Sequence, residues 1–192
     1  MSIESLVVEL SSDSENPELN FAVAVEYESL NQTASAISFY LRTVEFGNVS
    51  HPLLAYSSLL RMAKCFHSQK DRNLTVTGVL LQAITILPDA PDAYFLLAQA
   101  YENLKSWQEC YTFSRIGLAI ADLRPEGYFK FPIHTTYAGK YCLEYQSAIS
   151  AFWVGRVKES KKDLKALNTR EDMDPMFKQS IEKNLEMLDA FV

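Results

Sequence analysis

Apolar residues recur at helical spacing along most of the chain, in stretches of about 12–15 residues that short polar breaks separate. No stretch alternates between apolar and polar positions long enough to require a strand. Short helices joined by short breaks pack antiparallel against their neighbours in sequence, so the pattern predicts an all-α chain built of helix pairs. The residues expected on the apolar faces of the first two helices are Leu19, Val23, Tyr27 and Leu30, then Ala36, Tyr40 and Val44.

Two helix starts have a clear chemical signal. Asn16-Pro17-Glu18 and Asp174-Pro175 each place a capping side chain before a proline, which suits the first position of a helix. The expected organisation is a mobile or docked arm over 1–15, three helix pairs over 16–123, a loop over 124–139, a less regular fourth pair over 140–168, and a terminal helix over 174–192. The loop contains two prolines and several aromatic residues. Its aromatic residues are expected either to plug the helical stack or to form a binding loop.

A small residue followed three positions later by an aromatic one recurs along the chain, at Ala24/Tyr27, Ala63/Phe66 and Ala98/Tyr101. The third unit is the most regular and continues through Cys110, Ser114 and Gly117, where small side chains let two helices approach closely. With these positions the chain resembles the tetratricopeptide repeat, a helix pair of about 34 residues. The resemblance implies a right-handed α-solenoid of about four antiparallel helix pairs. An amphipathic terminal helix with Phe177, Ile181, Leu185 and Leu188 on one face is expected to cover the last pair.

In this family the first helix of each pair lines a concave groove that holds a partner. The resemblance therefore assigns a set of groove residues: Phe21, Val25, Glu28, Leu60, Lys64, Phe95, Gln99, Glu102, Tyr145 and Ile149. Apolar residues stand where some members of the family use polar side chains to hold a terminal carboxylate. We therefore expect an apolar and aromatic groove that suits an amphipathic helix or an extended peptide. The alternative is that part of this stripe is core.

Charge adds a second candidate surface. The net charge of −6 disfavours nucleic acid as a partner, and the first thirty residues contain no Lys or Arg. The basic residues gather instead in one stretch: Arg156, Lys158, Lys161, Lys162 and Lys165. This stretch is either a solvated helix face or an electropositive surface, which would bind an acidic partner or support a homo-oligomer or larger assembly.

The sequence contains no recognisable catalytic or metal-binding motif. Cys65 and His67 are two apart on an expected helix and point away from each other, and Asp172 and Asp174 are expected to serve a helix start. We therefore expect no cofactor, no metal and no enzymatic activity. The three cysteines are expected as buried free thiols, and neither a signal peptide nor a membrane-inserted segment is apparent, which together favour the cytoplasm.

A second resemblance supplies the alternative function. The stretches 16–47, 91–118 and 141–167, together with Asn184-Leu185, are similar to helical-repeat regions that accompany family-2-type glycosyltransferases in bacteria and phages. The α/β catalytic domain of those proteins is absent from this sequence. The sequence therefore favours a non-catalytic interaction or scaffold module, with a non-catalytic accessory of a glycosyltransferase system as the alternative.

Overall fold

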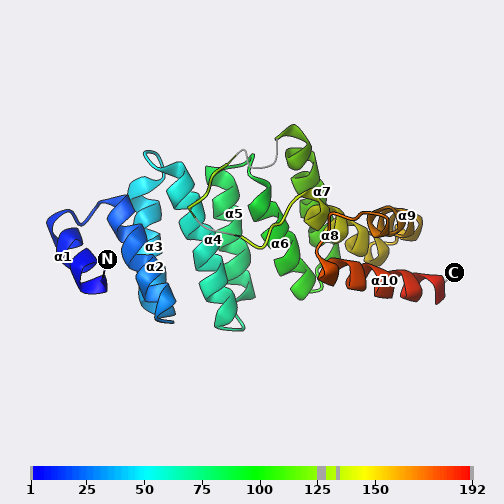
Figure 1. Ribbon diagram of the computed structural model, residues 1–192, viewed down its shortest axis with the longest axis horizontal. Helices are drawn as coiled ribbons and strands as arrows, with labels where there is room; N and C mark the ends of the chain where they lie inside the picture. Colours follow the sequence, from blue (N-terminus) through cyan, green and yellow to red (C-terminus); the bar gives the residue numbers. More distant parts are fainter. Residues whose placement is uncertain (1, 125–128, 133–134, 191–192) are drawn as a thin grey trace. The chain divides into compact units, whose positions relative to one another are not determined.

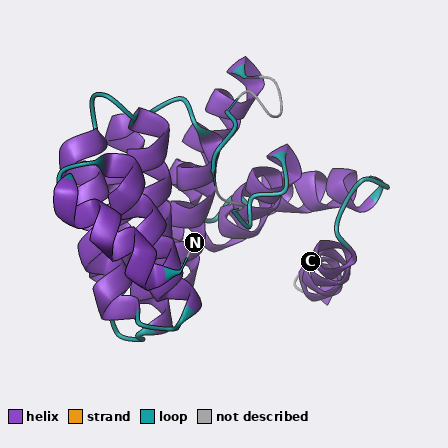
Figure 2. Cartoon of the chain, turned by 60° about the vertical axis from the view of Figure 1, so that its left-hand side comes forward, coloured by secondary structure: helices purple, strands orange, loops and turns teal. Residues whose placement is uncertain are grey.

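The computed structural model describes residues 2–124, 129–132 and 135–190, and within these ranges the regular structure is entirely helical (Figures 1 and 2). The chain divides into two compact units, Met1–Pro88 with Phe129–Thr135, and Asp89–Tyr128 with Thr136–Val192. The first unit contains the helices α1 (Ile3–Ser12), α2 (Pro17–Ser29), α3 (Thr33–Gly47), α4 (Pro52–Ser68) and α5 (Asn73–Ile86). The second contains α6 (Pro91–Asn103), α7 (Trp107–Leu123), α8 (Lys140–Trp153), α9 (Val157–Asn168) and α10 (Pro175–Ala190).

Within the first unit, α2 packs on α3, and α4 packs on both α3 and α5. The segment expected as a mobile or docked arm is the helix α1, which packs against α2. Its Leu6 and Leu10 are buried in one cluster with Val23 of α2. Two leucines four residues apart form only a short apolar stripe, so the sequence pattern alone did not reveal this helix.

The tight turns between paired helices repeat almost unchanged. Asn31, Lys105 and Gly155 have positive φ angles of 57°, 57° and 83° in the turns after α2, α6 and α8. In each turn the next amide donates back to a carbonyl in the preceding helix, over 2.8–2.9 Å. The turn between α4 and α5 contains two such residues, Lys70 and Asp71, at the point where the sequence has one residue more. The helix pairs are thus repeats in local geometry as well as in sequence.

Both helix starts expected from the sequence are confirmed. The Asn16 side chain accepts hydrogen bonds from the amides of Glu18 and Leu19, and the Asp174 carboxylate accepts one from the Met176 amide over 2.8 Å. The sequence places Leu30 on the apolar face of this first helix, and that expectation is wrong. Leu30 follows the last residue of α2 and is 54% exposed, because the helix ends before it can turn this side chain inward.

The second unit shows why a small residue is needed in α7. A Cβ atom at Gly117 would lie 2.8 Å from the Tyr94 Cβ of α6 and 2.8 Å from the Leu143 Cδ2 of α8. Three helices therefore meet at this glycine. At the end of the unit, α10 packs on α9 and α8 and buries Ile181 and Leu188.

Candidate functional site

The expected groove residues differ in how far they reach the surface. Leu60, Phe95 and Ile149 are only 4%, 1% and 7% exposed, so they belong to the core, as the alternative interpretation of the stripe had allowed. Lys64 is exposed. The others are half-buried: Phe21, Val25, Glu28, Gln99, Glu102 and Tyr145. Any partner surface on these helices is therefore smaller and more polar than the sequence predicted.

The described part of the loop over 124–139 contributes aromatic side chains to both units. In the first unit the ring of Phe131 stacks on Tyr56 of α4, with ring centres 4.9 Å apart. In the second unit the ring of Tyr137 lies against Phe95 of α6, at 5.7 Å. Tyr137 therefore contributes to the burial of Phe95. Pro125 to Tyr128 and the pair Ile133 and His134 of this loop lie outside the described residues.

A charged cluster joins α2, α3 and α4 around Glu28. The Glu28 carboxylate accepts a hydrogen bond from the Tyr40 hydroxyl at 2.7 Å and one from the Arg61 guanidinium at 2.8 Å. The ammonium of Lys64 lies 3.3 Å from its other oxygen. Only 14% of the Glu28 side chain is exposed, and Arg61 Nε is buried with no hydrogen-bond partner among the described residues.

These contacts set the charge state of the cluster. Burial raises the pKa of Glu28, but the hydrogen bonds from Tyr40 and Arg61 outweigh it, so the pKa lies below its ordinary value. Burial and the neighbouring Glu28 raise the pKa of Tyr40. Glu28 is therefore a charged, internally paired residue whose first role is to join three helices. Sequence reasoning missed Arg61, whose partner lies 33 residues earlier in the chain.

The corresponding position in the second unit is Glu102, which takes part in a different arrangement. The Gln146 side-chain amide of α8 donates to Glu102 at 2.9 Å, and the thiol of Cys110 lies 3.6 Å from the Gln146 oxygen. On the same helix as Gln146, the Tyr145 ring meets Phe177 of α10 edge-on, at 5.2 Å. The C-terminal helix thus covers part of the α8 face that was expected to receive a partner.

The basic stretch lies on α9 and the residue before it. Arg156 lies over the Tyr111 ring, 5.0 Å from its centre, and Lys161 pairs with Asp189 of α10 at 2.8 Å. Lys158, Lys162 and Lys165 are exposed and have no ion pair within the described ranges. They recur three to four residues apart, so they form one stripe along α9.

Asp172, Cys65 and His67 do not combine with other metal-binding side chains in the described part of the chain. Asp172 pairs with Arg170 at 2.7 Å, a hydrogen bond that lowers the Asp172 pKa to about 2. The thiol of Cys65 is buried, whereas the His67 side chain is exposed. In the described part of the chain no three His, Cys, Asp or Glu side chains gather as a metal site requires. None of the helices described there combines the length and the apolar content needed to cross a membrane.

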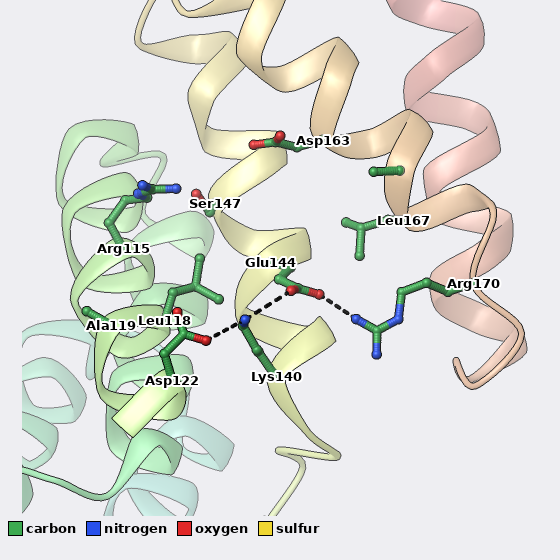
Figure 3. A pocket seen from close by; sticks show the side chains of 11 residues that line it. Arg115, Leu118, Ala119, Asp122, Lys140, Glu144, Ser147, Asp163, Leu167 and Arg170 are labelled. Atoms are coloured by element: carbon green, nitrogen blue, oxygen red, sulfur yellow. Dashed lines mark hydrogen bonds and ion pairs between the residues drawn. The ribbon is translucent and has the colours of Figure 1, made fainter. Parts of the chain in front are cut away.

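The second unit contains a cleft of about 460 Å³ that the sequence did not predict (Figure 3). It is formed by three stripes: one of α7 from Arg115 to Asp122, one of α8 from Lys140 to Ser147, and one of α9 from Asp163 to Leu167 that Arg170 continues just after the helix ends. Each stripe follows the three- and four-residue spacing of one helix face. No motif reveals the cleft in the sequence, because its three walls come from segments that are far apart along the chain.

One end of the cleft holds a chain of ion pairs (Figure 3). Lys140 lies 2.5 Å from Asp122 and 3.7 Å from Glu144, and Glu144 accepts from Arg170 at 2.7 Å. Lys140 donates a hydrogen bond to Asp122, and this contact raises the pKa of Lys140, so its ammonium stays charged beside the two carboxylates. Leu118 of α7 and Leu167 of α9 line the middle of the cleft.

No known family model matches the sequence, and no curated protein matches it. Solved structures do share its fold. MamA of Desulfovibrio magneticus, from residue 41 to its end, superposes with a TM-score of 0.61 at 11% identity, over 86% of this chain and 81% of that one. A putative kinesin light chain of Podosopora anserina with TPR-like repeats gives 0.61 at 15% identity, over 91% and 87%.

A thermophilic TPR protein of Thermus thermophilus gives a TM-score of 0.57 at 14% identity, over 96% of this chain and 89% of that one. Identities this low establish the fold alone, and these similarities give no support to a glycosyltransferase link. They confirm the fold class expected from the sequence: the chain is an all-α protein with the tetratricopeptide-repeat-like solenoid fold.

Proposed function

We propose that the protein is a non-catalytic protein-interaction or scaffold module that binds a peptide or protein through the first helices of its repeats. The observation that carries the proposal is the tetratricopeptide-like fold combined with side chains that remain accessible on those helices. Repeat folds of this kind present extended surfaces and bind through them. A surface of mixed apolar and charged groups on a helical scaffold suits an amphipathic helix or an extended peptide.

The face of the first unit offers apolar surface beside a positive charge. Phe21 packs against the Tyr40 ring at 5.7 Å and is still half-buried, as is Val25 one turn further along α2. The Lys64 side chain is 77% exposed, although its ammonium lies close to Glu28. We propose that a partner places an apolar side chain against Phe21 and Val25 and an acceptor group near Lys64.

The face of the second unit is more polar. Gln99 and Glu102 are half-buried on α6, and the Tyr145 hydroxyl accepts from the Asn184 side chain at 3.3 Å. A partner there would meet hydrogen-bonding groups rather than the aromatic groove suggested by the sequence. The basic stripe Lys158, Lys162 and Lys165 is the alternative surface, for an acidic partner or a second copy. The buried free thiols favour a reducing compartment, which is why we place the protein in the cytoplasm.

Selection from a random peptide library displayed on phage tests the proposal. Peptides enriched on the wild-type protein are then measured against Val25→Glu and Lys64→Glu, which alter accessible side chains without opening the core. Ser38→Glu on the exposed side of α3 is the matched control. We expect the two groove variants to weaken binding by about tenfold or more, and the control to bind as the wild type does. Equal binding by all variants would overturn the proposed surface.

A further inference from the structure

At the end of the cleft away from the ion-pair chain, two charged side chains form no ion pair within the described residues. Arg115 of α7 and Asp163 of α9 line this end, and neither has an ion pair or hydrogen bond with any residue in the described ranges. In Figure 3 their side chains face each other across Ser147 of α8. The cleft thus presents one positive and one negative group on opposite walls.

Ser147 is a second, independent observation that points to a ligand at this end of the cleft. Ser147 is 2% exposed, and its hydroxyl oxygen is buried with no hydrogen-bond partner among the described residues. A buried hydroxyl without a partner costs about 1–3 kcal/mol, so such groups are rare unless something binds them. The hydroxyl lies between the Arg115 and Asp163 side chains, at the floor of the cleft (Figure 3).

The environment of Asp163 leaves its charge poorly compensated. Burial and the nearby Glu159 raise its pKa, although Lys162 and Arg115 act in the opposite direction. A cation placed against the carboxylate would remove this penalty. On the opposite wall, the Arg115 guanidinium offers donors that suit a carboxylate.

We propose that this cleft binds a small zwitterion, a free α-amino acid with an apolar side chain. Its carboxylate binds Arg115 and the Ser147 hydroxyl, its ammonium group binds Asp163, and its side chain lies between Leu118 and Leu167. Both unpaired charges are then neutralised by one ligand whose two charged groups are close together. A peptide does not fit as well, because its amino and carboxyl termini are at opposite ends of the molecule.

The site is separate from the partner-binding faces, because its walls come mainly from the second helices of the repeats, α7 and α9. Binding is measured by titration calorimetry with the wild-type protein and a panel of the standard amino acids. L-leucine is the reference probe, with N-acetyl-L-leucine and L-leucinamide as analogues that each lack one charge. We expect at least one apolar amino acid to bind, and each analogue of leucine to bind roughly tenfold more weakly than leucine itself.

Substitutions of the cleft residues test whether the amino acid binds in this cleft. Arg115→Gln and Asp163→Asn should each weaken binding by roughly tenfold or more. Lys158 is an exposed residue of α9 outside the cleft, so Lys158→Gln should leave binding unchanged. Ser147→Ala keeps the fold, because it removes only an unpaired hydroxyl, and should still weaken binding. The proposal is overturned if no amino acid binds, if the two analogues that each lack one charge bind as well as leucine, or if the cleft variants bind like the wild type.

Discussion

Gly117 tests most directly whether close helix packing, rather than helix propensity, determines which residues the repeats accept. Replacing Gly117 with Ala would place a methyl group 2.8 Å from Tyr94 Cβ and 2.8 Å from Leu143 Cδ2. Tyr94 Cβ is attached directly to the backbone, so a rotamer change cannot relieve that contact. α6 and α7 must move apart, and overpacking of this kind costs about 1–3 kcal/mol.

Helix propensity acts in the opposite direction, because Ala is better than Gly in a helix interior by about 1 kcal/mol. Gly78, in the middle of α5, isolates this contribution, since a Cβ there would have nothing within 4 Å. Gly78→Ala should therefore stabilise the protein by about 1 kcal/mol. The difference between the two variants removes the propensity effect and should leave about 1–3 kcal/mol for packing at Gly117.

The assay is urea unfolding of each full-length variant, followed by helical circular dichroism and, in parallel, by alkylation of the cysteines. Cys65 reports on the unit that contains Gly78, and Cys110 reports on the unit that contains Gly117. The reasoning would be refuted if Gly117→Ala stabilised its unit as much as Gly78→Ala stabilises the other. That result would mean that the helices do not meet at Gly117 as closely as described.

Three further predictions concern charge, backbone and thiol chemistry. Glu28→Gln should cost about 2 kcal/mol, because it leaves the Arg61 cation partly buried without its counter-charge. The pKa of Glu28 is lowered in the folded protein, so its contribution is present above the ordinary pKa of 4.5 and is lost as the pH falls through the folded value. The difference in unfolding free energy between wild type and variant should therefore shrink on acidification; a difference unchanged by pH would contradict the ion pair. Lys105→Gly should stabilise the protein by roughly 0.5–1 kcal/mol and Gly155→Ala destabilise it by about 1 kcal/mol in thermal melts, because both positions have positive φ. Shifts of the same sign would contradict the shared turn geometry. Burial raises the pKa of the Cys110 thiol to about 12, so iodoacetamide should not label it at pH near 8 until the protein unfolds, and rapid labelling of the native protein would show that the thiol is accessible.

The sequence was sufficient for the features that depend on local chemistry. Asn16 and Asp174 identified their helix starts because a capping side chain acts within two or three residues of its own position. Gly117 was recognised as a close-packing position from its place in a repeated pattern. The helix α1 was missed, because Leu6 and Leu10 acquire a hydrophobic environment only through contact with Val23 of the next helix.

The candidate site was harder to predict, because periodicity identifies a helix face and does not show what covers it. Phe95 was correctly placed on its face, but its burial involves Tyr137, which lies in a segment without helical periodicity. Periodicity likewise does not show that Glu28 pairs with Arg61, which lies 33 residues later in the chain. Ser147, at the floor of the cleft, looks from the sequence like any small residue on a buried helix.

We have proposed that partners bind to the first helices of the repeats. This is tested most directly by mapping amide chemical-shift changes when a library-selected peptide is added to the isotope-labelled protein. We expect the largest changes on α2, α4 and α6, around Val25, Lys64 and Gln99. Changes confined to the second helices, for example to the basic stripe of α9, would contradict it.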